Sequence, residues 1–264
     1  MLKMYLDDTG THQASPVVGV GGLVGTQAQW TDFDTRWKAL LAEPVPGAPS
    51  IKKWSSWDCR FGEGEFASYR EADRDLATYR FRAVITESGV ISASNMIDNI
   101  AWKGLVIPKF GPAMASAEAT ALFQVIERIR PWAAKEPEGP EIAIYYDAGR
   151  NQGDVEKLAG LLTQARNPFP QIASFAFVPV VRATPLQGAD MIATEAFWYA
   201  KDILKYGDDA PMRPHFKAYL ANNYARGDGQ LLDRPAIERD IERRNPDGTL
   251  KTERAIWQWS VRLS

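Results

Sequence analysis

The sequence predicts an α/β fold: a mixed five-stranded sheet with flanking helices, a helical insertion and a C-terminal appendage. Two observations lead to this prediction. Apolar stretches at residues 2–7 and 16–24 lie on either side of the turn-prone segment 9–11, so they predict an opening β-hairpin. From residue 141 onward, apolar strand-like runs alternate with amphipathic segments, which is typical of parallel α/β units.

The region after the hairpin is predicted to be largely helical. Five apolar residues recur with a helical period and indicate one buried helix face: Trp30, Phe33, Trp37, Leu40 and Leu41. This helix should end before Pro44. A Pro- and Gly-rich connector and a polar helical segment at about 63–78 follow, so we interpret residues 29–78 as an insertion. Residues 79–96 are apolar or alternating and predict the third strand.

The second half of the chain supplies the remaining sheet elements. A helix is expected from Pro112 to about Arg130, closed by Pro131. Three further elements are expected in order: a strand at 141–146, a helix at about 153–166 and a strand at 172–178.

The last long helix should begin at Thr184 as N-cap and run to about Leu204. Pro185 would occupy the first helical position, and Gln187 would complete a capping box with Thr184. Residues 1–206 would then form the main domain. Residues 207–264 are interpreted as an appendage, possibly packed on the same domain, with helix-like sequence near 235–244.

Composition limits the possible functions. The chain has 264 residues, 45% hydrophobic and 24% charged, which is enough for a large core. The sequence contains neither a secretion signal nor an apolar run long enough to span a membrane, and its single cysteine excludes an intramolecular disulfide. These features fit a cytoplasmic protein. The net charge of −2 argues against strong nonspecific binding of nucleic acid, so any such contact would depend on local basic patches.

Four carboxylates occupy unusual positions. Asp7 and Asp147 each end an apolar strand, and ligands of open α/β sheets gather at the carboxyl ends of strands. Glu118 and Asp190 lie on the apolar faces of their helices. Each acid has an ordinary explanation as a turn former or as a charge at a helix start. Together they predict an oxygen-ligand site for Mg²⁺ or Mn²⁺, because clustered carboxylates repel unless cations neutralise them.

The order of these elements and acids resembles the ribonuclease H-like superfamily. Residues 5–10 (YLDDTG) resemble an opening Asp-Glu-Ser-Gly motif, and residues 186–190 (LQGAD) resemble a closing Leu-Gln-x-Ala-Asp motif. Both motifs belong to the domain-of-unknown-function family 3800, which is regarded as ribonuclease H-like. The resemblance covers about residues 1–205 and implies that Asp7, Asp147 and Asp190 are metal ligands.

The chain departs from that family pattern at two positions. Asp8 stands where the family usually has Glu, and Thr9 where it usually has Ser. Asp8 is thus a further candidate ligand. Because neighbouring residues of a strand face opposite ways, Asp7 and Asp8 can share a metal only if the strand has already ended.

A second group of residues could contact nucleic acid. Basic and aromatic residues interleave in the insertion, as they do where phosphate contacts accompany base stacking: Lys52, Lys53, Trp54, Trp57 and Arg60. The alternative is that the tryptophans pack on the domain and the lysines are solvated.

The sequence therefore predicts a metal-dependent nuclease that hydrolyses RNA or DNA through a two-metal site held by Asp7, Glu118, Asp147 and Asp190. The alternative is a non-catalytic ribonuclease H-like module that binds a protein or nucleic acid, in a phage-defence or mobile-element system. A metal phosphatase acting on small nucleotides is disfavoured, because the sequence has no Gly-rich phosphate loop.

Overall fold

The computed structural model describes residues 1–12, 14–111, 116–137, 141–148, 153–164, 171–210 and 228–243. Its centre is a six-stranded sheet in the order β5-β4-β1-β2-β3-β6. The strands are β1 (Leu2–Thr9), β2 (Val17–Gly25), β3 (Ile91–Asp98), β4 (Ile142–Asp147), β5 (Ile172–Val178) and β6 (Asp228–Leu232). Only β2 runs antiparallel to its neighbours, so the sheet is mixed.

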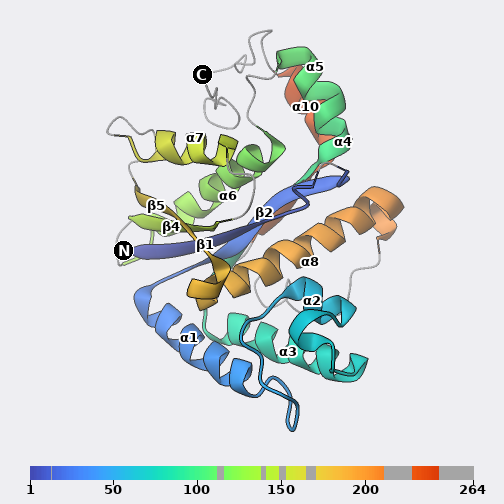
Figure 1. Ribbon diagram of the computed structural model, residues 1–264. Coiled ribbons are helices and arrows are strands. Elements are labelled where there is room, and N and C mark those ends of the chain that lie inside the picture. The colour runs from blue at the N-terminus through green and yellow to red at the C-terminus, as the bar shows by residue number, and fades with distance from the viewer. Residues whose placement is uncertain are drawn as a thin grey trace.

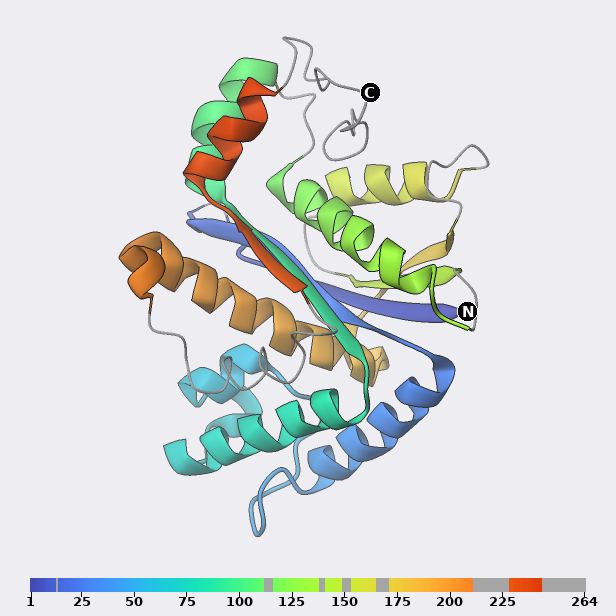
Figure 2. The same ribbon diagram turned by 180° about the vertical axis from the view of Figure 1, so that it is seen from behind.

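Helices cover both faces of this sheet (Figures 1 and 2). On one face lie α6 (Ala117–Ala133) and α7 (Gly153–Leu162). On the other lie α8 (Thr184–Tyr206) and the insertion helices α1 (Gln27–Ala42), α2 (Ser56–Phe61) and α3 (Glu71–Glu87). The predicted α/β fold class, a mixed sheet with flanking helices, is confirmed. No described helix is both long enough and apolar enough to cross a membrane.

The alternation of β1 explains how the two faces form. Leu2, Met4 and Leu6 are buried in the core cluster that includes α6 and α7. Tyr5 points to the other face, where it packs against the cluster built from α1, α3 and α8. The same alternation fixes where the acids at the end of this strand can point.

Glycines of β2 let α8 approach the sheet closely. A Cβ atom on Gly21 would lie 2.6 Å from the backbone of Ala193 in α8. Gly21 is also the register partner of Asp7 on β1. The absent side chain thus brings α8, and with it Asp190, close to the strand that carries Asp7.

The predicted third strand is partly wrong. Residues 79–87 belong to α3, and only the segment from Ile91 forms β3. Ala77, Phe81 and Val84 are buried at helical spacing, and Phe81 packs edge-on against Trp37 of α1 at 4.7 Å. Packing against α1 therefore stabilises a helix at residues 79–87, although their local alternation is typical of a strand. The insertion extends correspondingly from α1 to the end of α3, beyond the predicted residue 78.

The helix predicted at 112–130 is shifted along the chain. The described helix begins at Ala117 with Ser116 as its cap, and it continues through Pro131 to Ala133. Proline costs one backbone hydrogen bond at this position, and a last turn tolerates that loss.

Part of the chain after residue 207 joins the central sheet. Strand β6 pairs parallel with β3, and α10 (Arg234–Glu242) follows it, close to the predicted helix at 235–244. The sheet therefore has six strands where five were predicted. Residues 244–264 lie outside the described part of the chain.

Candidate functional site

The acids predicted from the sequence come from separate elements that meet near the carboxyl ends of β1 and β4. Strand β1 continues to Thr9, so Asp7 and Asp8 lie within it and face opposite ways. Asp7 shares the α8 face with Asp190, and Asp8 shares the α6 face with Glu118. Asp147 is the last residue of the neighbouring strand β4.

The carboxyl groups of Asp7 and Asp190 influence each other directly. Asp7 is 9% exposed, and burial raises its pKa well above the ordinary value, with further increases from Asp190, Asp8 and Asp147. Burial also raises the pKa of Asp190, as does the charge of Asp147. Two buried acids that repel each other favour either protonation or a bound cation.

Hydrogen bonds orient Asp190 from two sides. The Ser56 backbone N–H, at the start of α2, donates to Asp190 Oδ2 at 2.8 Å. The Thr194 hydroxyl donates to Asp190 Oδ1 at 3.4 Å from the next turn of α8. These bonds fix the carboxylate and link the insertion directly to the acid site.

Asp147 is held where β4 ends. Its Oδ1 accepts a hydrogen bond from the Val180 backbone N–H at 2.8 Å. Burial raises the pKa of Asp147, whereas hydrogen bonds from the backbone of Val180 and Ala148 and the nearby charge of Lys53 lower it. The Lys53 ammonium therefore acts electrostatically on Asp147.

Glu118 belongs to the opposite face of β1. The Tyr146 hydroxyl donates to Glu118 Oε1 at 3.0 Å from the buried side of β4. Burial, and then the charge of Asp8, raises the pKa of Glu118 to about 7, while the Tyr146 hydrogen bond opposes the shift. Burial also raises the pKa of Asp8, as does the charge of Asp147. Glu118 is thus an acid that gains and loses its proton near neutral pH.

The chemistry of this donor set fits a hard divalent cation. All five groups are carboxylates, the ligands that Mg²⁺ and Mn²⁺ prefer. Burial raises all five pKa values, and repulsion from neighbouring acids adds to the shift at Asp7, Asp8, Glu118 and Asp190. The cluster is not a finished metal site: within the described residues, no three His, Cys, Asp or Glu side chains are arranged to hold an ion as they stand. A cation would have to draw the carboxylates together.

The residues that the sequence predicts to contact nucleic acid differ in their exposure. Trp54 is 2% exposed, and its indole N–H donates to the Ser56 hydroxyl, so it cannot stack on a base. Lys52 is exposed and Lys53 is half-buried. Arg60 is exposed and lies 4.1 Å from the ring centre of Trp198, a residue of α8 that sequence reasoning missed.

Gln187 does not complete a capping box. Helix α8 has Ala183 as its N-cap, without a side-chain hydrogen bond, and the Thr184 hydroxyl donates to the Asp34 carboxylate. The Gln187 side-chain carbonyl instead accepts from Trp37 Nε1 at 3.0 Å and from the Trp54 backbone N–H at 2.8 Å. Gln187 therefore anchors the insertion to α8, three residues before Asp190.

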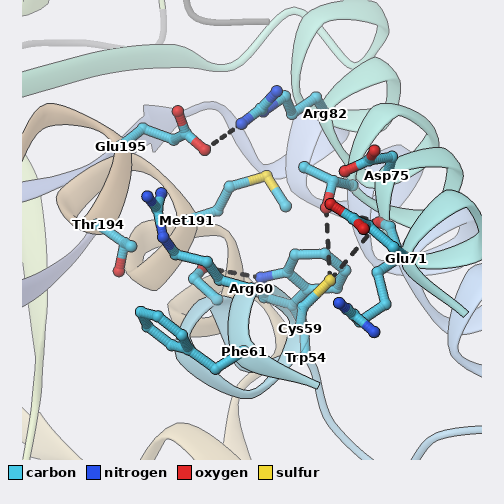
Figure 3. A pocket seen from close by; sticks show the side chains of 13 residues that line it. Trp54, Cys59, Arg60, Phe61, Glu71, Asp75, Arg82, Met191, Thr194 and Glu195 are labelled. Atoms are coloured by element: carbon cyan, nitrogen blue, oxygen red, sulfur yellow. Dashed lines mark hydrogen bonds and ion pairs between the residues drawn. The ribbon is translucent and has the colours of Figure 1, made fainter. Parts of the chain in front are cut away.

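A pocket of about 410 Å³ lies between the insertion and α8 (Figure 3). It borders the acid site through two shared residues, Ser56 and Thr194, both of which bond to Asp190. An ion pair between Arg82 and Glu195 lies in its wall. Its lining carries charges of both signs, so it favours no single class of charged ligand.

No protein-family model and no curated protein matches the sequence. A crystal structure of Bst-RNase HIII in complex with Mn²⁺ is similar to this chain, with 14% sequence identity and a TM-score of 0.42, over 86% of this chain and 71% of that one. A similarity at this level assigns no residue and no activity to the chain.

Proposed function

We propose that the protein is a Mg²⁺- or Mn²⁺-dependent nuclease that hydrolyses phosphodiester bonds of RNA or DNA. The observation that carries the proposal is the gathering of carboxylates from β1, β4, α6 and α8 into one electrostatically coupled cluster. The motif resemblance to the domain-of-unknown-function family 3800 at Asp7 and Asp190 supports it.

The proposed roles follow from the geometry. Asp7, Asp147 and Asp190 would hold the cation, with Asp8 approaching from the other face of β1. A divalent cation bound there would supply Lewis-acid stabilisation of the charge that develops on the phosphate. Lys53 would contact the phosphate from outside the cluster. Glu118, whose pKa is about 7, would take up or release a proton at neutral pH.

Tyr146 is a positioning residue in this scheme. It is 1% exposed, and its hydroxyl reaches Glu118 Oε1 from the core. That contact fixes the direction in which Glu118 presents its other oxygen. The proton-transfer group is therefore held by the sheet rather than by a flexible loop.

A cleavage assay with a matched pair of variants tests the proposal. Single-stranded, duplex and hybrid substrates are incubated with Mg²⁺ or Mn²⁺, and the parent is compared with Asp147→Asn. Asp32→Asn, which alters an exposed i,i+4 ion pair on α1, serves as the control. We expect the parent and Asp32→Asn to cleave at equal rates and Asp147→Asn to fold but lose cleavage. Equal cleavage by Asp147→Asn would refute the site assignment.

The alternative function is a non-catalytic ribonuclease H-like binding module. One observation favours it: as they stand, the described acids are not arranged to hold a metal ion. Crystals soaked in Mn²⁺ separate the two functions. Two ions among the carboxylates would favour the nuclease, whereas an acid cluster that stays empty would favour the binding module.

A further inference from the structure

One side of α8 connects the acid site to partly exposed aromatic and basic side chains. Asp190, Thr194, Trp198 and Lys201 follow one another at spacings of four, four and three residues, so they lie along a single stripe of the helix. The stripe is about 16 Å long at 1.5 Å per residue. It begins at a proposed metal ligand and leads away from it along the surface of α8.

Helix α2 places two more aromatic rings beside this stripe. Trp57 is 54% exposed and Phe61 is 45% exposed, although both are large apolar side chains. Their ring centres are 4.4 Å apart, and Phe61 lies 6.4 Å from Trp198. Trp57 follows Ser56, which bonds to Asp190, so this end of the aromatic row also starts at the acid site.

These rings are held in place before any ligand binds. The Trp57 indole N–H donates to Glu63 Oε2 at 3.2 Å, which fixes the ring against Phe61. Trp198 has two cations close to it: Arg60 Cζ lies 4.1 Å and Lys201 Nζ 4.4 Å from its ring centre. Rigid exposed rings lose little conformational entropy when a flat ligand stacks on them.

The charges of this surface are only modestly positive. The carboxylates of Glu195 and Asp202 act on Arg60, and Glu63 bonds to Trp57, so acids offset the two cations of this surface. Stacking must therefore supply more of the binding than phosphate neutralisation does. A duplex presents its backbone and hides the faces of its bases, so it would gain little from exposed rings.

We propose that Trp57, Phe61 and Trp198, together with Arg60 and Lys201, form a track for single-stranded nucleic acid that leads to or from the acid cluster. Unpaired bases would stack on Trp57 and Phe61, and the two cations held over the Trp198 ring would contact phosphates. The proposal rests on the proposed function, and it narrows the substrate to a chain that is unpaired beside the cleavage site.

Binding measured apart from cleavage tests the track. Fluorescence anisotropy with short single-stranded and duplex oligonucleotides is recorded in the Asp147→Asn background, so that substrate is not consumed. Trp57→Ala and Phe61→Ala should each weaken single-strand binding by roughly 5- to 100-fold. Trp57→Phe should retain most of the affinity, because it keeps a ring. Lys201→Ala should reduce the slope of log affinity against log salt by about 0.7.

Tyr79→Ala is the matched control, because Tyr79 is 63% exposed on α3 and is not part of the track. The proposal is overturned if Trp57→Ala and Phe61→Ala bind as tightly as their background, if Tyr79→Ala weakens binding equally, or if duplex binds as tightly as single strand. Ring-dependent binding without cleavage by the parent would refute only the nuclease. If the parent cleaves and the ring substitutions change neither binding nor cleavage, only the track is refuted.

Discussion

Replacing Glu118 by Gln should stabilise the cation-free protein at alkaline pH and change little in acid. The pKa of Glu118 is raised from 4.5 to about 7 in the folded state, mainly by burial. The folded protein therefore binds this proton more tightly than the unfolded chain does. The stability that this proton contributes is fully present below the pKa of Glu118 in the unfolded chain. It is lost as the pH rises through the pKa of Glu118 in the folded protein.

Linkage sets the size of this effect. Ionisation of Glu118 should lower the free energy of unfolding by about 1 kcal/mol at about pH 5 and by about 3 kcal/mol at about pH 8. These are upper values, because the side chain is only partly buried and solvent screens its charge. Gln keeps the shape of the side chain, and its carbonyl can still accept the Tyr146 hydrogen bond. Glu118→Gln should thus gain a stability advantage that grows with pH.

Urea unfolding in EDTA at these two pH values measures the advantage. Glu156→Gln, on an exposed position of α7, is the control and should show no pH-dependent change. Manganese should then stabilise the parent more than Glu118→Gln at alkaline pH, because the cation relieves the repulsion that the substitution has already removed. A stability difference that stays constant between the two pH values would refute the account of Glu118.

Two further predictions concern how the site is assembled. Gln187→Ala leaves the Trp37 indole N–H and the Trp54 backbone N–H without their acceptor. It should therefore lower the free energy of unfolding, measured in urea, by about 2 to 5 kcal/mol. A loss below about 0.5 kcal/mol would show that Gln187 does not anchor the insertion. Gly21→Ala places a Cβ 2.6 Å from the backbone of α8 and should cost about 1 to 3 kcal/mol and weaken Mn²⁺ binding in calorimetry. Gly104→Ala, whose Cβ meets nothing within 4 Å, is its control, and equal Mn²⁺ affinity in both variants would contradict the role of Gly21.

Strong local patterns made much of the sheet predictable. β1, β4 and β5 lie within two residues of their predicted bounds, because apolar runs bounded by turn residues leave few alternatives. Residues 79–87 show where such reasoning fails. Their alternation fits a strand, but Phe81 fits into a helix pair with Trp37, and that partner lies more than forty residues away in the sequence.

The sequence singles out the acids of the candidate site but not the groups that hold them. Acids at strand ends and on apolar helix faces stand out in a sequence, since burying a charge without compensation is costly. Tyr146, Ser56 and Val180 gave no such signal, because their roles depend on contacts with distant segments. Gln187 was misassigned for the same reason: a local capping motif explained it, whereas its partners lie in the insertion.

The placement of Asp147 explains how acids on opposite faces of a strand can act together. Asp7 and Asp8 point to different sides of β1, so neither reaches both halves of the cluster. The pairing of β1 with β4 ends at Leu6, just before these two acids, and Asp147 is the last residue of β4 at the same end of the sheet. Its charge contributes to the raised pKa values of Asp7, Asp8 and Asp190 alike. Neutralising Asp147 should therefore lower all three pKa values at once, which makes Asp147→Asn the single substitution that most directly uncouples the cluster.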